Sequence, residues 1–315
     1  MNGIRIRATG HCVPDHVVTN DDLAKRMDTS DEWIVSRTGI RRRHHITTQT
    51  QTDLCIGAAR AALDAGRIAA GDIGVCIVAT VSPHTLIPST ACMVQQALGL
   101  DEDTLCFDLN AACSGFVFAL HTAECLLAAA GKKKALIIGA EALSRIVNWE
   151  DRLSCILFGD GAGAVVVESR EEWASIGAVV GSDGNEKLLH AAGPGSGLLP
   201  QIAMEGTKVF RFAVETVSDC MDKVLAKHGA SMEEIDWFVF HQANERIIDL
   251  VRRKHGIPEE KVYLNVNEYG NTSAASIPIA LSELVHKGMA HSGDRILLVG
   301  FGGGLTWGGA LVQLA

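Results

Sequence analysis

Hydrophobic positions along the chain fall into two kinds of run. Short continuous apolar runs are typical of strands buried on both faces, and they lie at 73–79, 135–139, 237–240 and 295–299. Longer runs with apolar residues three and four apart, at 53–66 and 209–227, predict helices with one buried face. Because strands and helices alternate, we expect an α/β fold with a mostly parallel sheet.

Two pairs of segments resemble each other across the chain. FGDGAGAVVV (158–167) is similar to FGGGLTWGGALV (301–312), and NAACSGFVFAL (110–120) is similar to NTSAASIPIAL (271–281). The likeness predicts two halves of one topology, 1–170 and 171–315, packed about a pseudo-twofold axis. Three valines, and no helix, follow the glycines of 158–167. We therefore reject a dinucleotide-binding loop there.

The segment 104–120 combines a strand-like run, a turn of small residues and a helical pattern. This order places Cys113 at the first turn of a helix, where unpaired backbone N–H groups and the positive helix end favour the thiolate. We interpret Cys113 as a nucleophile. The alternative is one more buried cysteine, since free cysteine is among the most buried residue types.

His241 and Asn271 share this sequence context, since each follows a predicted strand and precedes a helix. Ligands of open α/β sheets bind at that end of the strands. Taken singly, His241 has the simpler interpretation of a hydrogen-bonded core histidine, and Asn271 that of a turn residue. The repeated context favours one shared site.

Basic residues gather after a capped helix near the N-terminus, in the run 41–43. Such a run is usually a solvated face. The alternative is an anion site, in which Trp33 offers an aromatic plate for a flat base and Arg37 a guanidinium for phosphate. The histidine pair 44–45 has no suitably spaced third ligand, so we expect no metal site.

Composition restricts the class of protein. The 315 residues are 47% hydrophobic with a net charge of −9, which argues against a nucleic-acid binder. Nine cysteines without C-x-x-C spacing indicate reduced thiols and no disulfide framework. The N-terminus lacks an apolar signal core, and His121 and Glu124 interrupt the longest apolar helix. We therefore expect a cytoplasmic protein without a membrane span.

Six sequence motifs, in this order along the chain, resemble those of the thiolase superfamily and, within it, of the 3-oxoacyl-[acyl-carrier-protein] synthase III family. They are DEWIVSRTGI (31–40), AACSGF (111–116), FGDGAGAVVV (158–167), HQANERI (241–247), YGNTSAAS (269–276) and GFGGGLTWG (300–308). The resemblance implies a thiolase-like fold, in which two duplicated βαβαβαββ halves form five layers, α-β-α-β-α.

The resemblance also implies an activity. Cys113 would take an acyl group from acyl-CoA and condense it with malonyl-acyl carrier protein, with loss of carbon dioxide, at the start of fatty acid biosynthesis. His241 and Asn271 would donate hydrogen bonds to the enolate oxygen, and the N–H groups of Cys113 and Gly303 would form the oxyanion hole. No cofactor beyond these substrates is implied.

Matching the family residue by residue implies further contacts. CoA would bind Trp33, Arg37, Arg152 and Asn244; the acyl pocket would contain Ile87, Phe301 and Met204; the carrier protein would meet Arg211, Arg246, Arg253 and Lys254. The last four are otherwise ordinary surface cations. The family is dimeric, and the loop at 86–87 would close the partner's acyl pocket.

Two other functions stay open at this point. One is a related condensing enzyme or acyltransferase of a specialised pathway that uses another acyl-CoA. The other is a CoA- or acyl-binding protein without catalysis, against which the intact set of Cys113, His241 and Asn271 argues. The length and branching of the primer do not follow from the sequence.

Overall fold

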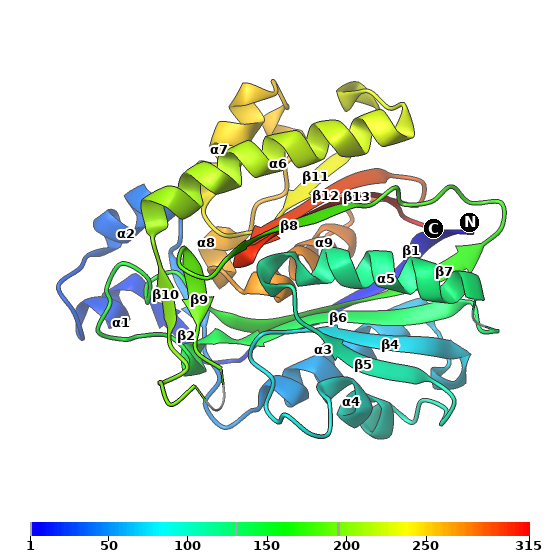
Figure 1. The fold of residues 1–315 in the computed structure, drawn as a ribbon, viewed down its shortest axis with the longest axis horizontal. Coiled ribbons are helices and arrows are strands. Elements are labelled where there is room, and N and C mark those ends of the chain that lie inside the picture. The colour runs from blue at the N-terminus through cyan, green and yellow to red at the C-terminus, as the bar shows by residue number, and fades with distance from the viewer. Residues whose placement is uncertain (1, 130, 194–195) are drawn as a thin grey trace.

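The computed structural model describes residues 2–129, 131–193 and 196–315, in which two sheets and three layers of helices alternate (Figure 1). The first sheet has the order β1-β7-β6-β4-β5 and the second the order β11-β12-β13-β8. The strands of the first are β1 (Gly3–Cys12), β7 (Asp160–Arg170), β6 (Lys134–Ala142), β4 (Ile73–Ala79) and β5 (Leu105–Leu109). Those of the second are β11 (Trp237–Phe240), β12 (Arg295–Gly302), β13 (Gly304–Gln313) and β8 (Val179–Asn185).

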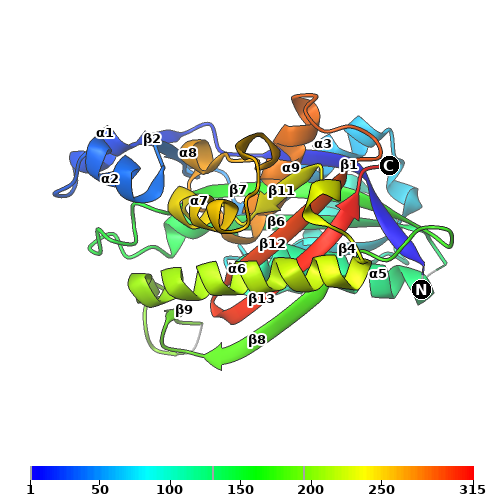
Figure 2. The same ribbon diagram turned by 90° about the horizontal axis from the view of Figure 1, so that it is seen from above.

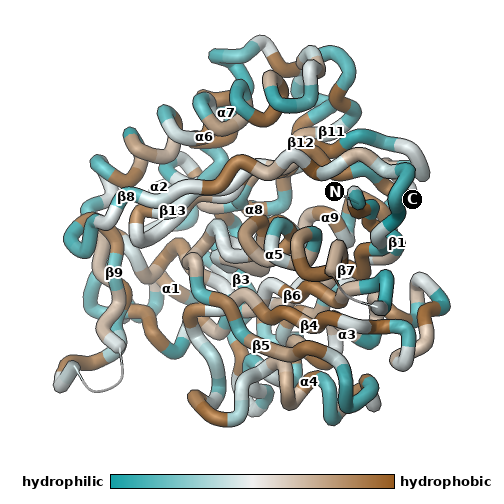
Figure 3. Tube along the Cα trace, turned by 45° about the vertical axis from the view of Figure 1, so that its right-hand side comes forward, coloured by the Kyte–Doolittle hydropathy of each residue, from teal (hydrophilic) through white to brown (hydrophobic). Residues whose placement is uncertain are grey.

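Helices cover both faces of each sheet, which gives the expected five-layer thiolase-like architecture (Figures 1 and 2). The outer helices are α3 (Gln51–Gly66) and α4 (Thr90–Leu98) on the first sheet, and α6 (Gly206–His228) and α7 (Glu245–Lys254) on the second. The central layer contains α5 (Gly115–Ala129) and α9 (Ser276–His286). α5 and α9 are enclosed by sheets. Most of their residues are therefore hydrophobic, as the colouring by hydropathy shows (Figure 3).

One stretch, Ala112–Ala129, is long and apolar enough to cross a membrane by length and composition alone. The sequence had predicted no such segment. Half of this stretch is buried in the structure, where α5 lies between the two sheets. Core helices of this kind meet the same criterion, so the finding reflects the central position of α5.

The two sheets share a strand order, with one difference. Numbered in chain order within each half, with the run 262–266 counted as the third strand of the second half, both sheets contain the order second, fourth, fifth, first, and β5 adds the third strand at one edge of the first sheet. In the second half the run 262–266 makes only a single bridge, Phe238 to Val262, and leads into the short helix α8 (Val266–Tyr269). The prediction of a strand directly before Asn271 is therefore wrong.

The side chain of Gln242 explains this difference. Its Nε2 donates to the carbonyl oxygens of Phe240 and Tyr263, at 2.8 and 3.3 Å, and its Oε1 accepts from Asn265 N at 3.0 Å. A side-chain amide thus satisfies backbone groups that a strand ladder would otherwise pair. The hydrophobic pattern alone does not reveal that a side-chain amide takes the place of a strand ladder.

Small elements close one end of the layers. They are α1 (Asn20–Ala24), α2 (Asp31–Thr38), the strand pair β2 (Val17–Thr19) and β3 (Arg42–His44), and the strand pair β9 (Leu189–Ala191) and β10 (Ile202–Met204). Figure 1 places them together at the left of the molecule. Thr19 caps α1 and Ser30 caps α2, as their positions before acidic first turns predict.

The basic run 41–43 is divided between the surface and the interior. Arg43 is fully buried, and its guanidinium donates to Asn20 Oδ1 at 2.7 Å and to the Ile156 carbonyl at 2.6 Å. Arg42 points the other way along β3 and pairs with Glu268 at 3.0 Å. Alternation along the strand separates the side chains, so the interpretation as a solvated face holds for Arg41 and Arg42 but not for Arg43.

Candidate active site

A cavity of about 1280 Å³ opens at the end of the molecule that carries the small elements. Cys113, His241, Asn271 and Phe301 all line it, although they come from four different segments of the chain. The structure therefore brings together the three side chains that the sequence singled out. The cavity walls come from α2, the loop after β4, the pair β9–β10 and the first turns of α6 and α7.

Cys113 lies in a 3-10 turn, Ala112–Ser114, directly before α5. Asn110 Oδ1 accepts from Ala112 N at 3.2 Å, and Ala112 adopts a positive φ of 47°. Ser114 Oγ donates to the Ala111 carbonyl at 2.8 Å. These bonds within the turn hold the sulfur at the floor of the cavity.

The glycine loop between β12 and β13 closes on the nucleophile from the other half. A Cβ added at Gly302 would lie 2.7 Å from Cys113 N and 3.1 Å from its Sγ, so only glycine permits this approach. The backbone N–H groups of Gly303 and of Cys113 itself both lower the pKa of the Cys113 thiol. Thr306 fixes the loop, because its Oγ1 donates to the Ala111 carbonyl at 2.9 Å.

The protonation state of Cys113 differs from the expectation. The removal of water raises the pKa of the Cys113 thiol to about 12, although a hydroxyl of Ser273 and two backbone N–H groups favour the charged form. The sequence argument considered the positive end of a helix and left out desolvation, which is the larger effect here. At neutral pH the resting group is a thiol.

His241 follows the last residue of β11 and is 1% exposed. Its backbone N–H donates to the Val299 carbonyl at 2.8 Å, and its Nδ1 lies 2.7 Å from Ser276 Oγ at the start of α9. Burial lowers the pKa of the His241 imidazole to about 3, so the ring is neutral at physiological pH. With Nδ1 engaged, Nε2 is the nitrogen available to the cavity.

Asn271 is held by backbone and side chain together. Its N–H donates to the Leu157 carbonyl at 2.8 Å, and Gly159 N donates to its carbonyl at 3.0 Å. Its Oδ1 accepts from Ser273 N at 2.8 Å. Because the oxygen of the amide is engaged in the turn, the amide nitrogen is the group left to donate toward a substrate.

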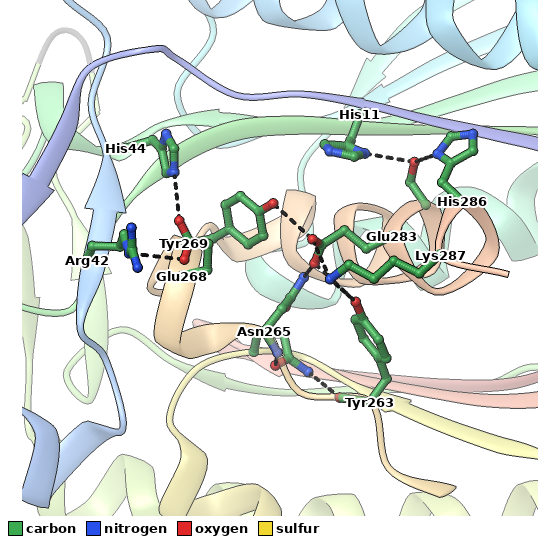
Figure 4. Close-up of polar contacts among 12 residues, drawn as sticks. His11, Arg42, His44, Tyr263, Asn265, Glu268, Tyr269, Glu283, His286 and Lys287 are labelled. Atoms are coloured by element: carbon green, nitrogen blue, oxygen red, sulfur yellow. Dashed lines mark hydrogen bonds and ion pairs between the residues drawn. The ribbon is translucent and has the colours of Figure 1, made fainter. Parts of the chain in front are cut away.

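A network of polar side chains supports the segment that carries Asn271 (Figure 4). Glu283 on α9 accepts from Asn265 Nδ2 at 2.7 Å, from Tyr269 OH at 3.1 Å and from Lys287 Nζ at 2.9 Å. Tyr269 stands two residues before Asn271, so the network ties α8 and the following turn to the central helix. The network thereby fixes the backbone at Asn271 from the side of α9.

The residues assigned to CoA gather at the mouth of the cavity. The guanidinium carbons of Arg37 and Arg152 lie 4.4 and 5.3 Å from the centre of the Trp33 ring. Asn244 Nδ2 donates to the Arg37 carbonyl at 3.0 Å, which joins α7 to α2. Trp33, Arg37 and Asn244 line the cavity, whereas Arg152 lies behind Trp33 and bonds the Asp28 carbonyl at 2.6 Å.

The three residues assigned to the acyl pocket lie in different surroundings. Phe301 is 3% exposed, and its ring centre lies 5.1 Å from that of His241 in an edge-on arrangement. Met204 lines the cavity at the end of β10. Ile87 is 89% exposed and does not line the cavity of its own chain, although Leu86 beside it does.

The four basic residues assigned to the carrier protein are all exposed on α6 and α7. Arg246 lines the cavity mouth, with its guanidinium 5.8 Å from the centre of the Phe210 ring. Arg211 follows Phe210 on α6. Arg253 and Lys254 lie at the opposite end of α7, and Arg253 pairs with Asp249 at 2.9 Å. Of the four, only Arg246 lines the cavity.

Sequence reasoning missed three polar side chains behind the site. Ser276 contacts His241, while Ser273 and the buried Glu141 lie next to Cys113. A signal for Glu141 was present, because one acidic residue interrupts the apolar run of β6. Among the described residues, no group of three His, Cys, Asp or Glu side chains is arranged to hold a metal ion.

Comparisons with known proteins agree with this geometry. The family model 3-oxoacyl-[acyl-carrier-protein (ACP)] synthase III matches residues 107–184, and the model of its C terminal matches residues 225–314. The beta-ketoacyl-[acyl-carrier-protein] synthase III of Clostridium acetobutylicum is 44% identical over 99% of both chains, and that of Alkalilimnicola ehrlichii is 46% identical over 99% of this chain and 100% of the relative.

Solved structures give the same result. The 3-oxoacyl-[acyl-carrier-protein] synthase III from Aquifex aeolicus VF5 superimposes with a TM-score of 0.93 at 44% identity, covering 99% of this chain and 100% of that one. Sequence and fold thus match over nearly the whole length. The chain belongs to the 3-oxoacyl-[acyl-carrier-protein] synthase III family of acyltransferases.

Proposed function

We propose that this protein condenses an acyl-CoA primer with malonyl-acyl carrier protein to give 3-oxoacyl-acyl carrier protein, CoA and carbon dioxide. The observation that carries the proposal is the convergence of Cys113, His241 and Asn271 on the floor of one cavity. A thioester is well matched to a sulfur nucleophile, and an acyl-cysteine divides the condensation into two steps. The reaction would begin fatty acid biosynthesis, in the cytoplasm and without a cofactor.

In the first step the sulfur of Cys113 attacks the thioester carbonyl of the primer. The developing oxyanion needs donors placed where its charge appears. The N–H groups of Cys113 and Gly303 both favour the charged form of the sulfur, and the loop at Gly302 lies against Cys113, so these groups could reach an oxygen on the attacked carbon. This arrangement supports their role as the oxyanion hole.

In the second step malonyl-acyl carrier protein loses carbon dioxide, and its charge collects on the thioester oxygen as an enolate. The neutral ring of His241 and the free amide nitrogen of Asn271 can both donate to that oxygen. Phe301 covers His241 and excludes water from the reacting carbon. The carbanion then attacks the acyl group on Cys113 and releases the product.

The cavity mouth fits the remainder of the CoA molecule. Trp33 offers a flat face for the adenine, with Arg152 behind it, and Arg37 offers a charge for the phosphates. Asn244 lies where the pantetheine arm would pass between α2 and α7. Met204 and Phe301 would contact the acyl chain.

The exposed strip of Arg211, Arg246, Arg253 and Lys254 fits an acidic carrier protein, and its attraction would weaken with salt. Arg246 is the member that stands at the cavity mouth, where the phosphopantetheine arm must enter. A fall in the affinity for malonyl-acyl carrier protein on raising the salt concentration, with the acylation rate unchanged, tests this strip.

A homodimer is part of the proposal. β5 is an edge strand of the first sheet, Leu105 on it is 48% exposed, and Ile87 in the loop after β4 is 89% exposed. A second copy would cover these apolar groups and bring Ile87 to the partner's acyl pocket. Sedimentation of the wild type as a dimer, and of Leu105→Arg as a monomer, is the expected result.

Acyl transfer itself is tested by mass. After incubation with acetyl-CoA, the intact protein should gain one acetyl group on Cys113, and Cys113→Ser should gain none. His241→Ala should still form the adduct but lose malonyl decarboxylation. Absence of an adduct in the wild type would remove the basis of the proposal, and loss of both steps in His241→Ala would contradict the division of roles.

A specialised condensing enzyme that uses another acyl-CoA is the second candidate. The specific observation is that aliphatic residues, Leu86 and Ile87, occupy the loop assigned to the end of the acyl pocket. A panel of straight and branched acyl-CoA primers, assayed with malonyl-acyl carrier protein, separates the two. Preference for acetyl-CoA or another short primer supports initiation of fatty acid biosynthesis.

A further inference from the structure

Ser276, the first residue of α9, lies against the ring of His241. Its Oγ is 2.7 Å from Nδ1 of His241 and 3.3 Å from the backbone nitrogen of Gln242. Ser276 is 2% exposed and His241 is 1% exposed. A buried hydroxyl therefore joins the histidine at the end of β11 to the start of a central helix.

The two contacts of Ser276 determine the direction of each hydrogen bond. A backbone N–H can only donate, so the N–H of Gln242 donates to Ser276 Oγ. Within the part of the chain that the structure describes, the other hydrogen-bond partner of this hydroxyl is Nδ1 of His241. If Nδ1 carried the hydrogen, Oγ would accept two bonds and its own buried hydrogen would have no acceptor, which is unfavourable. The hydroxyl therefore donates to Nδ1.

We propose that the hydroxyl of Ser276 holds His241 in the tautomer that carries its hydrogen on Nε2. This inference rests on the proposed condensation and assigns the residue that makes its histidine a donor. A neutral imidazole has one N–H group, so a ring that accepts at Nδ1 donates at Nε2. In the other tautomer a lone pair of Nε2 would face the enolate oxygen and repel it. Ser276 is thus a positioning residue, which acts through His241.

Backbone bonds and packing hold these groups in place. Gln242, whose N–H orients Ser276, is fixed by its side chain, because its Oε1 accepts from Asn265 N at 3.0 Å. Phe301 covers the ring of His241, with the ring centres 5.1 Å apart. Burial lowers the pKa of His241 to about 3, so the ring stays neutral and its tautomer decides whether Nε2 donates.

The equivalent place in the first half carries no hydroxyl. Where the turn 271–277 has Ser276, the turn 110–116 has Gly115. The residue directly after β4 is a threonine, whereas His241 directly follows β11. The serine therefore occurs in the half that carries the histidine, and the shared turn does not require it.

Two serines of α9 provide a matched pair of variants. Ser276→Ala removes the hydroxyl that contacts His241. Ser282→Ala also removes a buried hydroxyl bonded to imidazole, because Ser282 Oγ lies 2.9 Å from His11 Nδ1 and 3.2 Å from His286 Nδ1 (Figure 4). His11 and His286 do not line the cavity, whereas His241 does. The two variants thus make the same chemical change, and only Ser276→Ala alters a catalytic residue's partner.

The first measurement is the ¹⁵N NMR spectrum of the histidine side chains, with His241 assigned by comparison with His241→Gln. In the wild type we expect a pyrrole-type Nε2 and a pyridine-type Nδ1 that accepts a hydrogen bond. The Nδ1 resonance should shift in Ser276→Ala, because that bond is lost, and should stay in place in Ser282→Ala. A pyrrole-type Nδ1 in the wild type would overturn the inference.

The second measurement separates the two steps of the reaction. Ser276→Ala should release carbon dioxide from malonyl-acyl carrier protein about tenfold more slowly, with KM within about twofold, because the donor to the enolate is no longer held. Acetylation of Cys113 by acetyl-CoA should stay within about twofold of the wild type, and Ser282→Ala should stay within that limit in both steps. Equal losses in the two serine variants, or in the two steps of Ser276→Ala, would overturn the inference.

Failure of the inference and failure of the proposed function give different results. A wild type that forms the acyl adduct and releases carbon dioxide, but carries its hydrogen on Nδ1 of His241, keeps the proposed function and refutes the role of Ser276. Absence of the adduct or of carbon dioxide release in the wild type would remove the proposed function, and the inference with it. If Ser276→Ala does not fold, the wild-type spectrum still decides between the tautomers.

Discussion

The turn that carries Cys113 and the turn that carries Asn271 have the same construction. In each, an asparagine side chain accepts from a backbone N–H two residues later, Asn110 from Ala112 and Asn271 from Ser273. In both, the donating residue has a positive φ and begins a short 3-10 helix that leads into a central helix. One backbone design thus presents a thiol in one half and a carboxamide in the other.

From the first turn both Asn110 and Cys113 line the cavity, whereas from the second turn Asn271 does and Ala274 does not. Cys113 corresponds to Ala274, which is 1% exposed, and Asn271 corresponds to Asn110, which is exposed. The neighbouring strands differ accordingly: Gly302 lies against Cys113, whereas the buried Glu141 occupies the equivalent place of β6. A duplicated scaffold has therefore acquired two roles through a few side chains, without a change of backbone.

The largest effect that separates the turns should come from their asparagines. Asn271→Ala removes a donor to the enolate and should slow malonyl decarboxylation by about 10²- to 10³-fold. Asn110→Ala removes only the bond within its turn and should slow acylation by less than about tenfold. Rates of carbon dioxide release and of acyl-cysteine formation measure the two. Similar losses would show that both residues act as turn formers only.

The second comparison concerns Glu141, the buried acid at the place in β6 that corresponds to Gly302. Burial raises the pKa of Glu141 to about 7, above the unfolded value, so the folded protein keeps a proton that the unfolded chain releases. The wild type should therefore lose stability as pH rises through this interval, by up to about 3 kcal/mol relative to Glu141→Gln. Urea unfolding at about pH 5 and 8 measures this difference. A constant difference between the two proteins would contradict it.

The third comparison concerns the glycines under each turn. A Cβ at Gly139 would lie 2.1 Å from the Ala274 carbonyl oxygen, whereas one at Gly300 would lie 3.0 Å from Ser114 Cα. Gly139→Ala should therefore cost about 2–3 kcal/mol of stability and Gly300→Ala about 1 kcal/mol. Chemical denaturation gives both values, and the reverse order would refute the proposed packing.

The smallest effect should come from the hydrogen bonds to Glu283, which support only the turn that carries Asn271. Tyr269→Phe and Tyr263→Phe each remove one bond to Glu283, at 3.1 and 3.3 Å, and each should cost about 1 kcal/mol of stability. Only Tyr269 adjoins Asn271, so only Tyr269→Phe should also slow decarboxylation, by about two- to threefold. If both variants slow decarboxylation alike, Glu283 does not position Asn271.

Sequence patterns predicted the layers well and the interior chemistry less well. The bounds of β4 and β11 coincide with the predicted runs, because strands buried on both faces leave unambiguous patterns. The segment at 262–266 was misassigned, since a side-chain amide from Gln242 replaced a strand ladder. Local patterns do not contain such long-range bonds.

Burial of polar groups was the other source of error. Arg43 carries a charge and yet is fully enclosed by carbonyl and amide oxygens, which no charge count could reveal. The acidity of Cys113 was misjudged for the same reason, because desolvation depends on neighbours brought from both halves. The three central side chains were nevertheless found, since their place between a structural element and a helix is encoded locally.

The cavity walls and the cavity floor belong to different parts of the architecture. The floor is built on the turns that begin the two central helices, whereas the walls include the loop after β4 and the pair β9–β10, which lie outside the five layers. Changes in the walls need not disturb the enclosed helices. Redesign toward longer or branched products can therefore proceed by altering residues such as Leu86 and Met204 while the reacting groups keep their geometry.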